Sequence, residues 1–400
     1  MKSKTRFLTA LLMLLILTTS IPFAFAEGEA ISGQCGNNVY WSYNETTATL
    51  TIDGTGDMWD YDTNNESPFR AFYREMMIAN VHNGVTGLGS YSFYNCSSLK
   101  SVSLPNSLLK IGARAFACCD DLESIVIPDS VTELGEGVFF GGGWSTNLKS
   151  VVLGNGLTSV PKNTFLRCFS LESVSLGQNI QRIEKYAFMQ CQRLSEINIP
   201  DSVSYIGEEA FYQCYNLTQI HLSENVKTIE GSAFVMSGLT SLTIPSSVTR
   251  IQDGAFMNCE DLEQLVISSG VKEIGFGAFG MMTGRPDEYD TLKEITVPES
   301  VDVIESLAFS RAHLEKLTVL NPNCSFLEDE SMDQCTIVRE STTLYGYENS
   351  TTQQYAEKYG LTFVSIGEEP QTMDMDLFQR IIEWIRSVIA RIIEILHISF

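Results

Sequence analysis

The stretch YIGEEAFYQCYNLTQIHL at residues 205–222 decides the fold, because close copies of it recur along the chain. Three of them are KIGARAFACCDDLESIVI from residue 110, RIEKYAFMQCQRLSEINI from 182 and RIQDGAFMNCEDLEQLVI from 250. One phenylalanine anchors each copy, mostly 23 residues after the last: Phe93, Phe116, Phe139, Phe165, Phe188, Phe211, Phe234, Phe256, Phe279 and Phe309. Self-similarity at such a period predicts a solenoid of stacked units.

Each copy predicts one short strand. In residues 217–222 apolar and polar side chains alternate, which places Ile220 and Leu222 inside and His221 outside. A proline such as Pro200 closes many of the strands. One unit cannot bury its apolar face alone, whereas stacked units cover one another and build a continuous core.

The N-terminus predicts export from the cytoplasm, and the charge argues against one class of partner. Residues 1–26 begin with Lys2, Lys4 and Arg6, continue with an apolar run and end in AFA, as a secretory signal peptide does. The chain of 400 residues is 44% hydrophobic with a formal charge of −23. Such acidity argues against nucleic acid, whose phosphates need a basic surface. We therefore predict a secreted or cell-surface protein.

The quoted stretch also contains Cys214 and His221, the residue types of a thiol nucleophile and its base. Equivalent positions argue against that role. Six cysteines follow an anchor phenylalanine by three residues: Cys96, Cys119, Cys168, Cys191, Cys214 and Cys259. Glycine or methionine replaces them in other copies, so we predict buried packing residues. In the other copies, the position equivalent to His221 holds serine, threonine, valine or asparagine. We predict no catalytic, metal or cofactor site, and therefore no cofactor.

Other polar groups also fit structural roles. Glu208 and Glu209 are replaced by other residues in sister units and are predicted to form a solvated turn. DGTGD at 53–57 lacks calcium-loop spacing and is predicted to be a tight turn. A ladder of disulfides between stacked units is less favoured than a pair formed by Cys324 and Cys335.

The repeat resembles that of the BspA-like bacterial surface proteins, whose leucine-rich repeats span about 23 residues. Residues 32–61 are similar to the segment that opens many of those proteins, and residues 342–366 are similar to their closing cap. The resemblance implies an α/β-type repeat solenoid, a right-handed leucine-rich-repeat-like stack of short parallel strands with turns or short helices. It also implies adhesion to proteins or glycans of a host or of other microbes.

The predicted organisation follows from the repeats and their flanks. We predict a signal peptide at 1–26, an N-terminal cap at 27–80, about ten repeats at 81–320, a C-terminal cap at 321–366, a linker at 367–372 and an amphipathic helix at 373–400.

Binding is predicted on the outward strand face and on two insertions. Val126, Val152 and His221 are outward strand residues. The insertions at 141–147 and 281–290 carry larger anchor residues, of which Trp144, Arg285 and Tyr289 are candidates for contact with a partner.

The C-terminal residues 373–400 predict an amphipathic helix. One seam repeats with steps of four and three residues: Phe378, Ile382, Ile385, Ile389, Ile392 and Leu396. This spacing favours oligomerisation, whereas Trp384 and Phe378 would also suit a membrane interface. Docking onto the solenoid's own end is a third interpretation.

Three functions remain at this point. We expect a non-enzymatic adhesin at or near a bacterial cell surface. The alternatives are a surface scaffold that oligomerises through the C-terminal helix, and a secreted hydrolase that uses Cys214 or His221.

Overall fold

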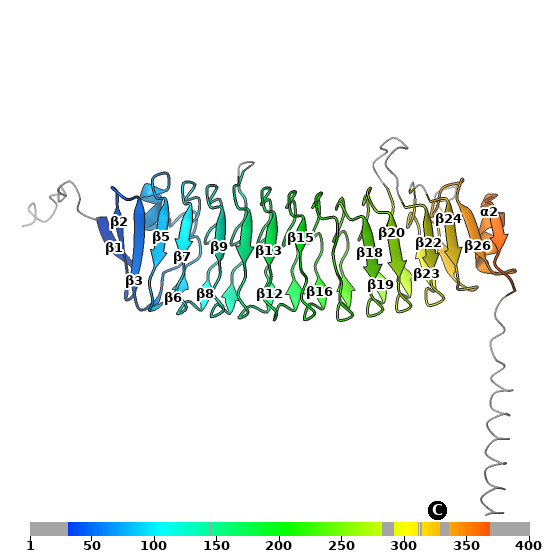
Figure 1. Cartoon of the computed structure of the whole chain (residues 1–400), viewed down its shortest axis with the longest axis horizontal. Helices are drawn as coiled ribbons and strands as arrows, with labels where there is room; N and C mark the ends of the chain where they lie inside the picture. Colours follow the sequence, from blue (N-terminus) through cyan, green and yellow to red (C-terminus); the bar gives the residue numbers. More distant parts are fainter. Residues whose placement is uncertain are drawn as a thin grey trace, which may run out of the picture. The chain divides into compact units, whose positions relative to one another are not determined.

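A computed structural model describes residues 31–143, 146–281, 292–310, 312, 314–328 and 336–368. The chain divides into two compact units, Met1–Ile180 and Gln181–Phe400. In each unit, short strands lie side by side as successive coils of the chain (Figure 1). The predicted boundaries at residues 80, 320 and 366 stay predictions.

The first unit begins with an antiparallel sheet that becomes parallel. Its strands are, in spatial order, β1 (Ile31–Gly36), β2 (Val39–Asn44), β3 (Thr49–Gly54), β5 (Ile78–Val81) and β7 (Ser101–Ser103). The 3-10 helix η2 (Pro68–Phe72) lies near the beginning of this stack, where Trp41 packs edge-on against Phe69 and Tyr43 stacks on Phe72. These aromatic side chains cover the end of the core that the repeats leave open.

Parallel strands then form two sides of each coil. One sheet contains β4 (Gly56–Asp57), β6 (Val85–Leu88), β8 (Lys110–Ile111) and β10 (Glu133–Leu134). Another contains β9 (Ser124–Val126), β11 (Ser150–Val152) and β13 (Ser173–Ser175), and β12 (Ser159–Val160) follows β11 along the chain. Val126 pairs in register with Val152, and Val152 with Ser175, so equivalent positions of the repeat form columns.

The second unit repeats this arrangement. Its first strands are β14 (Arg182–Ile183), β15 (Glu196–Ile197), β16 (Tyr205–Ile206) and β17 (Thr228–Ile229). Two further sheets pair β18 (Ser241–Ile244) with β20 (Gln264–Ile267), and β19 (Arg250–Ile251), β21 (Glu273–Ile274), β23 (Val303–Glu305) and β25 (Ser325–Leu327). The last sheet contains β22 (Glu294–Val297), β24 (Lys316–Val319), β26 (Thr343–Gly346) and β27 (Phe363–Ser365).

The third side of each coil is a turn, and not one of the short helices that the sequence allowed. The residue two positions before the anchor phenylalanine has a positive φ in every copy, for example Arg114 (+53°), Tyr186 (+61°) and Glu209 (+53°). A right-handed helix needs negative φ throughout. Within the described residues, helix is confined to η2 and α2 (Thr351–Tyr359). The described chain is therefore a β-solenoid, and its assignment to the α/β type is corrected.

The anchor phenylalanines form the centre of the core. In the second unit their rings stack with centroids 5.0–5.7 Å apart and planes within 6° of parallel, from Phe188 to Phe309. In the first unit the stack runs from Phe93 to Phe165 with centroids 5.1–6.0 Å apart. Backbone hydrogen bonds join the turns of neighbouring coils, as from Phe211 N–H to the Ala233 carbonyl at 2.7 Å.

Helix α2 covers the end of the last sheet. Ser350 caps its N-terminus by accepting a hydrogen bond from Gln353 N–H at 3.3 Å, and Gly360 ends it with a left-handed φ of +66°. Tyr355 stacks on Phe326 with ring centroids 4.4 Å apart, which fixes the helix against β25. In the part of the chain that the structure describes, no helix has the length and apolarity to cross a membrane.

Candidate binding surface

The outward face of the strands exposes the side chains that the alternation predicts. Val126 and Val152 lie side by side on β9 and β11 and are 63% and 42% exposed. Val266 on β20 is 55% exposed. Serine, threonine and other polar residues occupy most neighbouring positions of these columns, so each unit presents a polar face with isolated apolar contacts.

Cys214 and His221 do not form a catalytic pair. The Cys214 thiol is wholly buried and donates a hydrogen bond to the Phe188 carbonyl at 3.2 Å. Burial raises the pKa of the Cys214 thiol, which keeps it protonated. The His221 ring lies on the opposite side of the sheet surface, exposed to solvent.

Sister cysteines occupy the same environment. Cys119, Cys168 and Cys259 donate to the carbonyls of the preceding coil at 3.0–3.2 Å. Burial raises the thiol pKa of Cys96 and Cys259 to about 12. Each of these thiols thus supplies a hydrogen-bond donor to a backbone carbonyl inside the stack. Cys324 is buried, whereas its predicted partner Cys335 lies outside the described residues.

We expect Cys96, Cys168, Cys214 and Cys259 to resist alkylation by iodoacetamide at pH 8 in the native protein. Alkylation requires an accessible thiolate, and each thiol is buried and protonated. The rate should be at least about 100-fold below that in urea, because local opening must precede reaction. Mass spectrometry of tryptic peptides reads out each site. Rapid native labelling of Cys214 alone would instead identify a reactive thiol.

The acidic candidates have structural partners. Glu208 forms an ion pair with Lys185 of the preceding coil at 2.5 Å, and the backbone of Glu209 is one of the left-handed turn residues. Asp53 contacts His82 Nδ1 at 2.5 Å. Asp57 accepts from Lys110 at 2.7 Å and from Thr86 at 2.6 Å. The glycines between these aspartates have φ of +123° and +97°, and the chain bends at Thr55 between the end of β3 and the start of β4.

The strand ladder is interrupted beside His221. The residue that follows β9 or β11 donates its N–H to the next coil, as Ile127 does to the Val152 carbonyl at 2.8 Å and Leu153 to the Ser175 carbonyl at 2.9 Å. Among the described residues, the equivalent bond from Leu222 to Thr243 is missing, and residues 217–222 form no strand. One backbone bond remains there, from Thr240 N–H to the Thr218 carbonyl at 2.9 Å.

The interruption continues on the second side of the coil, where β17 and β19 belong to different sheets. We call this gap, between the coil of residues 217–229 and the coil of residues 240–251, the open seam. The third side is intact. Phe211 and Phe234 stack at 5.0 Å, and Gln213 N–H donates to the Val235 carbonyl at 2.8 Å. The coils thus separate on their strand sides while the phenylalanine side holds them together.

Side chains bridge the open seam where the backbone does not. The Glu224 carboxylate accepts hydrogen bonds from the Ser246 N–H at 3.0 Å and from the Ser246 hydroxyl at 2.6 Å. The Ser247 hydroxyl donates to the Val226 carbonyl at 2.5 Å. These bonds fix the loops that follow the strands and leave the strands themselves apart.

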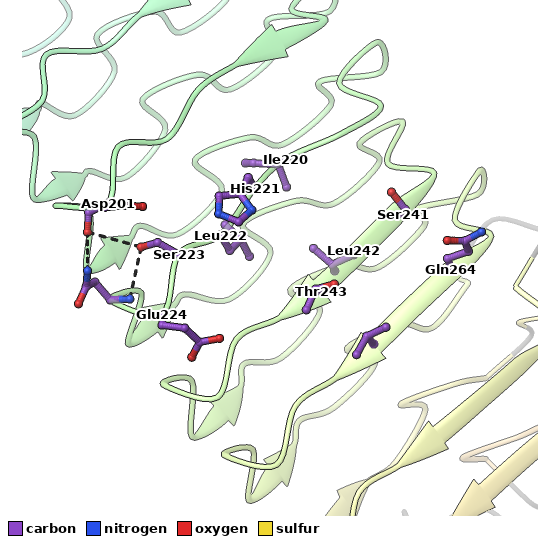
Figure 2. Close-up of a pocket in the computed structure, with 12 residues that line it drawn as sticks. Asp201, Ile220, His221, Leu222, Ser223, Glu224, Ser241, Leu242, Thr243 and Gln264 are labelled. Carbon is purple, nitrogen blue, oxygen red and sulfur yellow. Dashed lines mark hydrogen bonds between the residues drawn. The ribbon is translucent and has the colours of Figure 1, made fainter.

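A groove of about 600 Å³ lies on the open seam. One wall contains His221, Ser223 and Glu224, and the other contains Ser241 and Thr243, as Figure 2 shows. Its remaining lining residues are Asp201, Ile220, Leu222, Asn225, Leu242, Gln264 and Val266. Asp201 and Glu224 contribute carboxylates, and none of these lining residues is lysine or arginine. The groove therefore favours a neutral or cationic ligand.

The open seam coincides with a repeat that is one residue shorter than its neighbours, which the consensus repeat pattern does not show. The anchors Phe234 and Phe256 are 22 residues apart, and Leu239 follows Phe234 by five positions where Leu217 follows Phe211 by six. A second hollow of about 390 Å³ lies at the turn, between Tyr215 on one coil and Glu260 and Asp261 on another. Of the groove residues, sequence reasoning identified only His221.

The other predicted contact residues fall outside the described residues. Trp144, Arg285 and Tyr289 lie in the insertions, and the tail set comprises Phe378, Ile382, Trp384, Ile385, Ile389, Ile392 and Leu396. Their contacts stay predictions. Of the predicted strand-face residues, Val126 and Val152 belong to the first unit and His221 to the second.

Several solved structures are similar to this chain. A leucine-rich repeat protein from Bacteroides ovatus has a TM-score of 0.51 and 17% identity over 86% of this chain and 100% of its own. A leucine rich cell surface protein from Faecalibacterium prausnitzii has 25% identity and a TM-score of 0.43 over 83% and 98% of the two chains. The pneumococcal vaccine antigen PcpA has 14% identity and a TM-score of 0.39 over 86% and 100%. A search of curated protein sequences gave no match.

The repeats themselves match a family model. The model of the BspA type leucine rich repeat region matches residues 68–195, 143–263, 181–285 and 255–383, which overlap and together cover most of the chain. Its repeat accounts for the stacked phenylalanines and the parallel strand columns described above. This chain belongs to the BspA-type leucine-rich repeat family.

Proposed function

We propose that this protein is a secreted, cell-surface binding protein, an adhesin that contacts extracellular proteins or glycans of a host or of other microbes. The groove on the open seam carries the proposal, because it is a concave site on the outward face of the strands. The signal-like residues 1–26 and membership of the BspA-type family support export and surface display. The protein acts by binding and not by catalysis.

The test is binding of the purified protein to immobilised collagen, laminin and mucin by surface plasmon resonance. We expect at least one surface to retain the protein well above a leucine-rich repeat control of another family. The double variant His221→Ala and Gln264→Ala should weaken that binding about tenfold, the effect expected when ligand contacts worth about 1.4 kcal/mol are lost. The control variant Gln354→Ala, at an exposed position of α2 outside the strand faces, should retain it. Equal retention of the control solenoid would contradict adhesion.

Residues 373–400 are proposed to hold the protein at the envelope, through a membrane interface or through self-association. A chain that ends at Thr372 should appear in the culture medium, whereas the full-length protein should stay with the cell envelope, as fractionation and immunoblotting would measure. Light scattering separates the two routes: a mass that rises with concentration only in the full-length protein supports self-association. Equal release of both chains would contradict envelope retention.

A further inference from the structure

The open seam exposes backbone groups that regular coils use for pairing. In a parallel sheet, successive residues of a strand bond alternately to the neighbour on either side. Thr243 occupies the same position of the repeat as Val152 and Ser175. The carbonyls of Val152 and Ser175 accept hydrogen bonds from Ile127 and Leu153 of the coil before them, so this position faces the preceding coil. The N–H and carbonyl of Thr243 therefore face the open seam.

The opposite wall has unpaired groups as well. By the same alternation Ile220 and Leu222 face the open seam, and within the described residues neither forms a backbone hydrogen bond. Buried or half-buried backbone groups are costly to leave without partners, and Leu222 is buried. Both walls of the groove thus present donors and acceptors in the spacing of a strand.

Strand β18 is a well-formed template for pairing. It matches β20 over four residues, from Ser241 opposite Gln264 to Ile244 opposite Ile267. Its other edge borders the groove, where Ser241 and Thr243 line the wall. An edge of this kind binds extended peptides by adding a strand, with main-chain hydrogen bonds supplying affinity.

The side chains select among such peptides. Asp201 lies at one side of the groove, and Glu224 lies at the same end as Asp201 (Figure 2). The whole chain carries a formal charge of −23. A basic residue in the bound segment would gain from both carboxylates, whereas an acidic one would be repelled.

We propose that the open seam binds an extended polypeptide segment that pairs with β18 and places a basic side chain near Asp201 and Glu224. This inference deepens the proposed function and rests on it, because it assigns a ligand class to the same groove. Glycan recognition by this groove would be a different outcome.

The experiment uses the full-length protein and an acetylated, amidated hexapeptide of alternating lysine and valine, titrated by isothermal calorimetry. The same peptide methylated on alternate amide nitrogens should bind at least about tenfold more weakly, since it has lost donors needed for strand pairing. A glutamate–valine peptide should also bind at least tenfold more weakly. Equal binding of the methylated peptide would overturn strand pairing, and equal binding of the acidic peptide would overturn the proposed role of the carboxylates.

Two protein variants complete the test. Thr243→Pro removes the N–H that faces the open seam and should reduce affinity for the hexapeptide about tenfold, whereas Thr243→Val keeps the N–H and should bind normally. A thermal melt of each variant shows whether it is folded, and the methylated peptide needs no variant at all. Retention on collagen, laminin or mucin without any hexapeptide binding would overturn the inference and leave the proposed function standing. Absence of both would contradict both.

Discussion

Replacement of Phe211 by alanine is expected to lower the free energy of unfolding by about 3–5 kcal/mol. The ring is completely buried and lies between two parallel rings, with centroids 5.1 Å from Phe188 and 5.0 Å from Phe234. The truncation creates a cavity and removes both stacking contacts. Because each coil contacts only its neighbours, the lost stability falls on the two interfaces that join this coil to the coils before and after it. Urea denaturation followed by circular dichroism measures the change.

The effect should be larger than burial alone suggests, because Phe211 precedes the open seam. There the strand sides are apart, so the phenylalanine side carries most of the contact between the coils. Phe276→Ala is the matched control, since that ring is 43% exposed and its loss should change stability by less than about 0.5 kcal/mol. Equal destabilisation by the two variants would show that the stack is not the main source of stability.

Periodicity predicted the stack of phenylalanine rings because a given position of the repeat has the same surroundings in each copy. The 23-residue spacing aligned the phenylalanines, and strand alternation placed Leu222 inside and His221 outside, as the structure has them. Ile220 was predicted to lie inside and is half-buried. Its neighbouring coil is separated at the open seam, which leaves part of that side chain uncovered.

The turns were harder to predict because their backbone conformation does not follow from residue type. Arg114, Tyr186 and Glu209 have side chains that usually disfavour a positive φ. Neighbouring coils impose it through hydrogen bonds such as Tyr186 N–H to the Glu208 carbonyl at 3.1 Å. This stabilisation comes from contacts between coils, and a single repeat does not reveal it.

The groove follows from a departure from the repeat, which is why the consensus pattern did not identify it. Four residues separate Phe234 from Leu239 at a corner where five separate Phe211 from Leu217 in the preceding coil. The shorter path brings Gly238 against the Tyr215 carbonyl, 2.0 Å from where a β-carbon would lie. A chain shorter by about 3.3 Å cannot keep every strand residue in register with the coil before it. We infer that the short corner opens the seam.

Insertion of one asparagine between Ser237 and Gly238 should therefore close the open seam. The insertion restores the 23-residue spacing and allows Leu222 N–H to reach the Thr243 carbonyl. Each recovered backbone bond contributes about 0.5–1.5 kcal/mol, so the free energy of unfolding should rise by about 1–3 kcal/mol. Hydrogen exchange at the Leu222 amide should slow at least about tenfold, and the lysine–valine hexapeptide should lose its site.

A matched insertion separates this cause from a general effect of lengthening a turn. One asparagine placed between Cys214 and Tyr215 extends a corner that already has five residues, and should lower stability without protecting Leu222. If both insertions leave exchange at Leu222 unchanged in folded protein, the short corner is not what separates the strands. If the first insertion closes the ladder but the hexapeptide still binds, the peptide site lies elsewhere on the solenoid. Slow exchange together with lost peptide binding would establish that one missing residue creates the site.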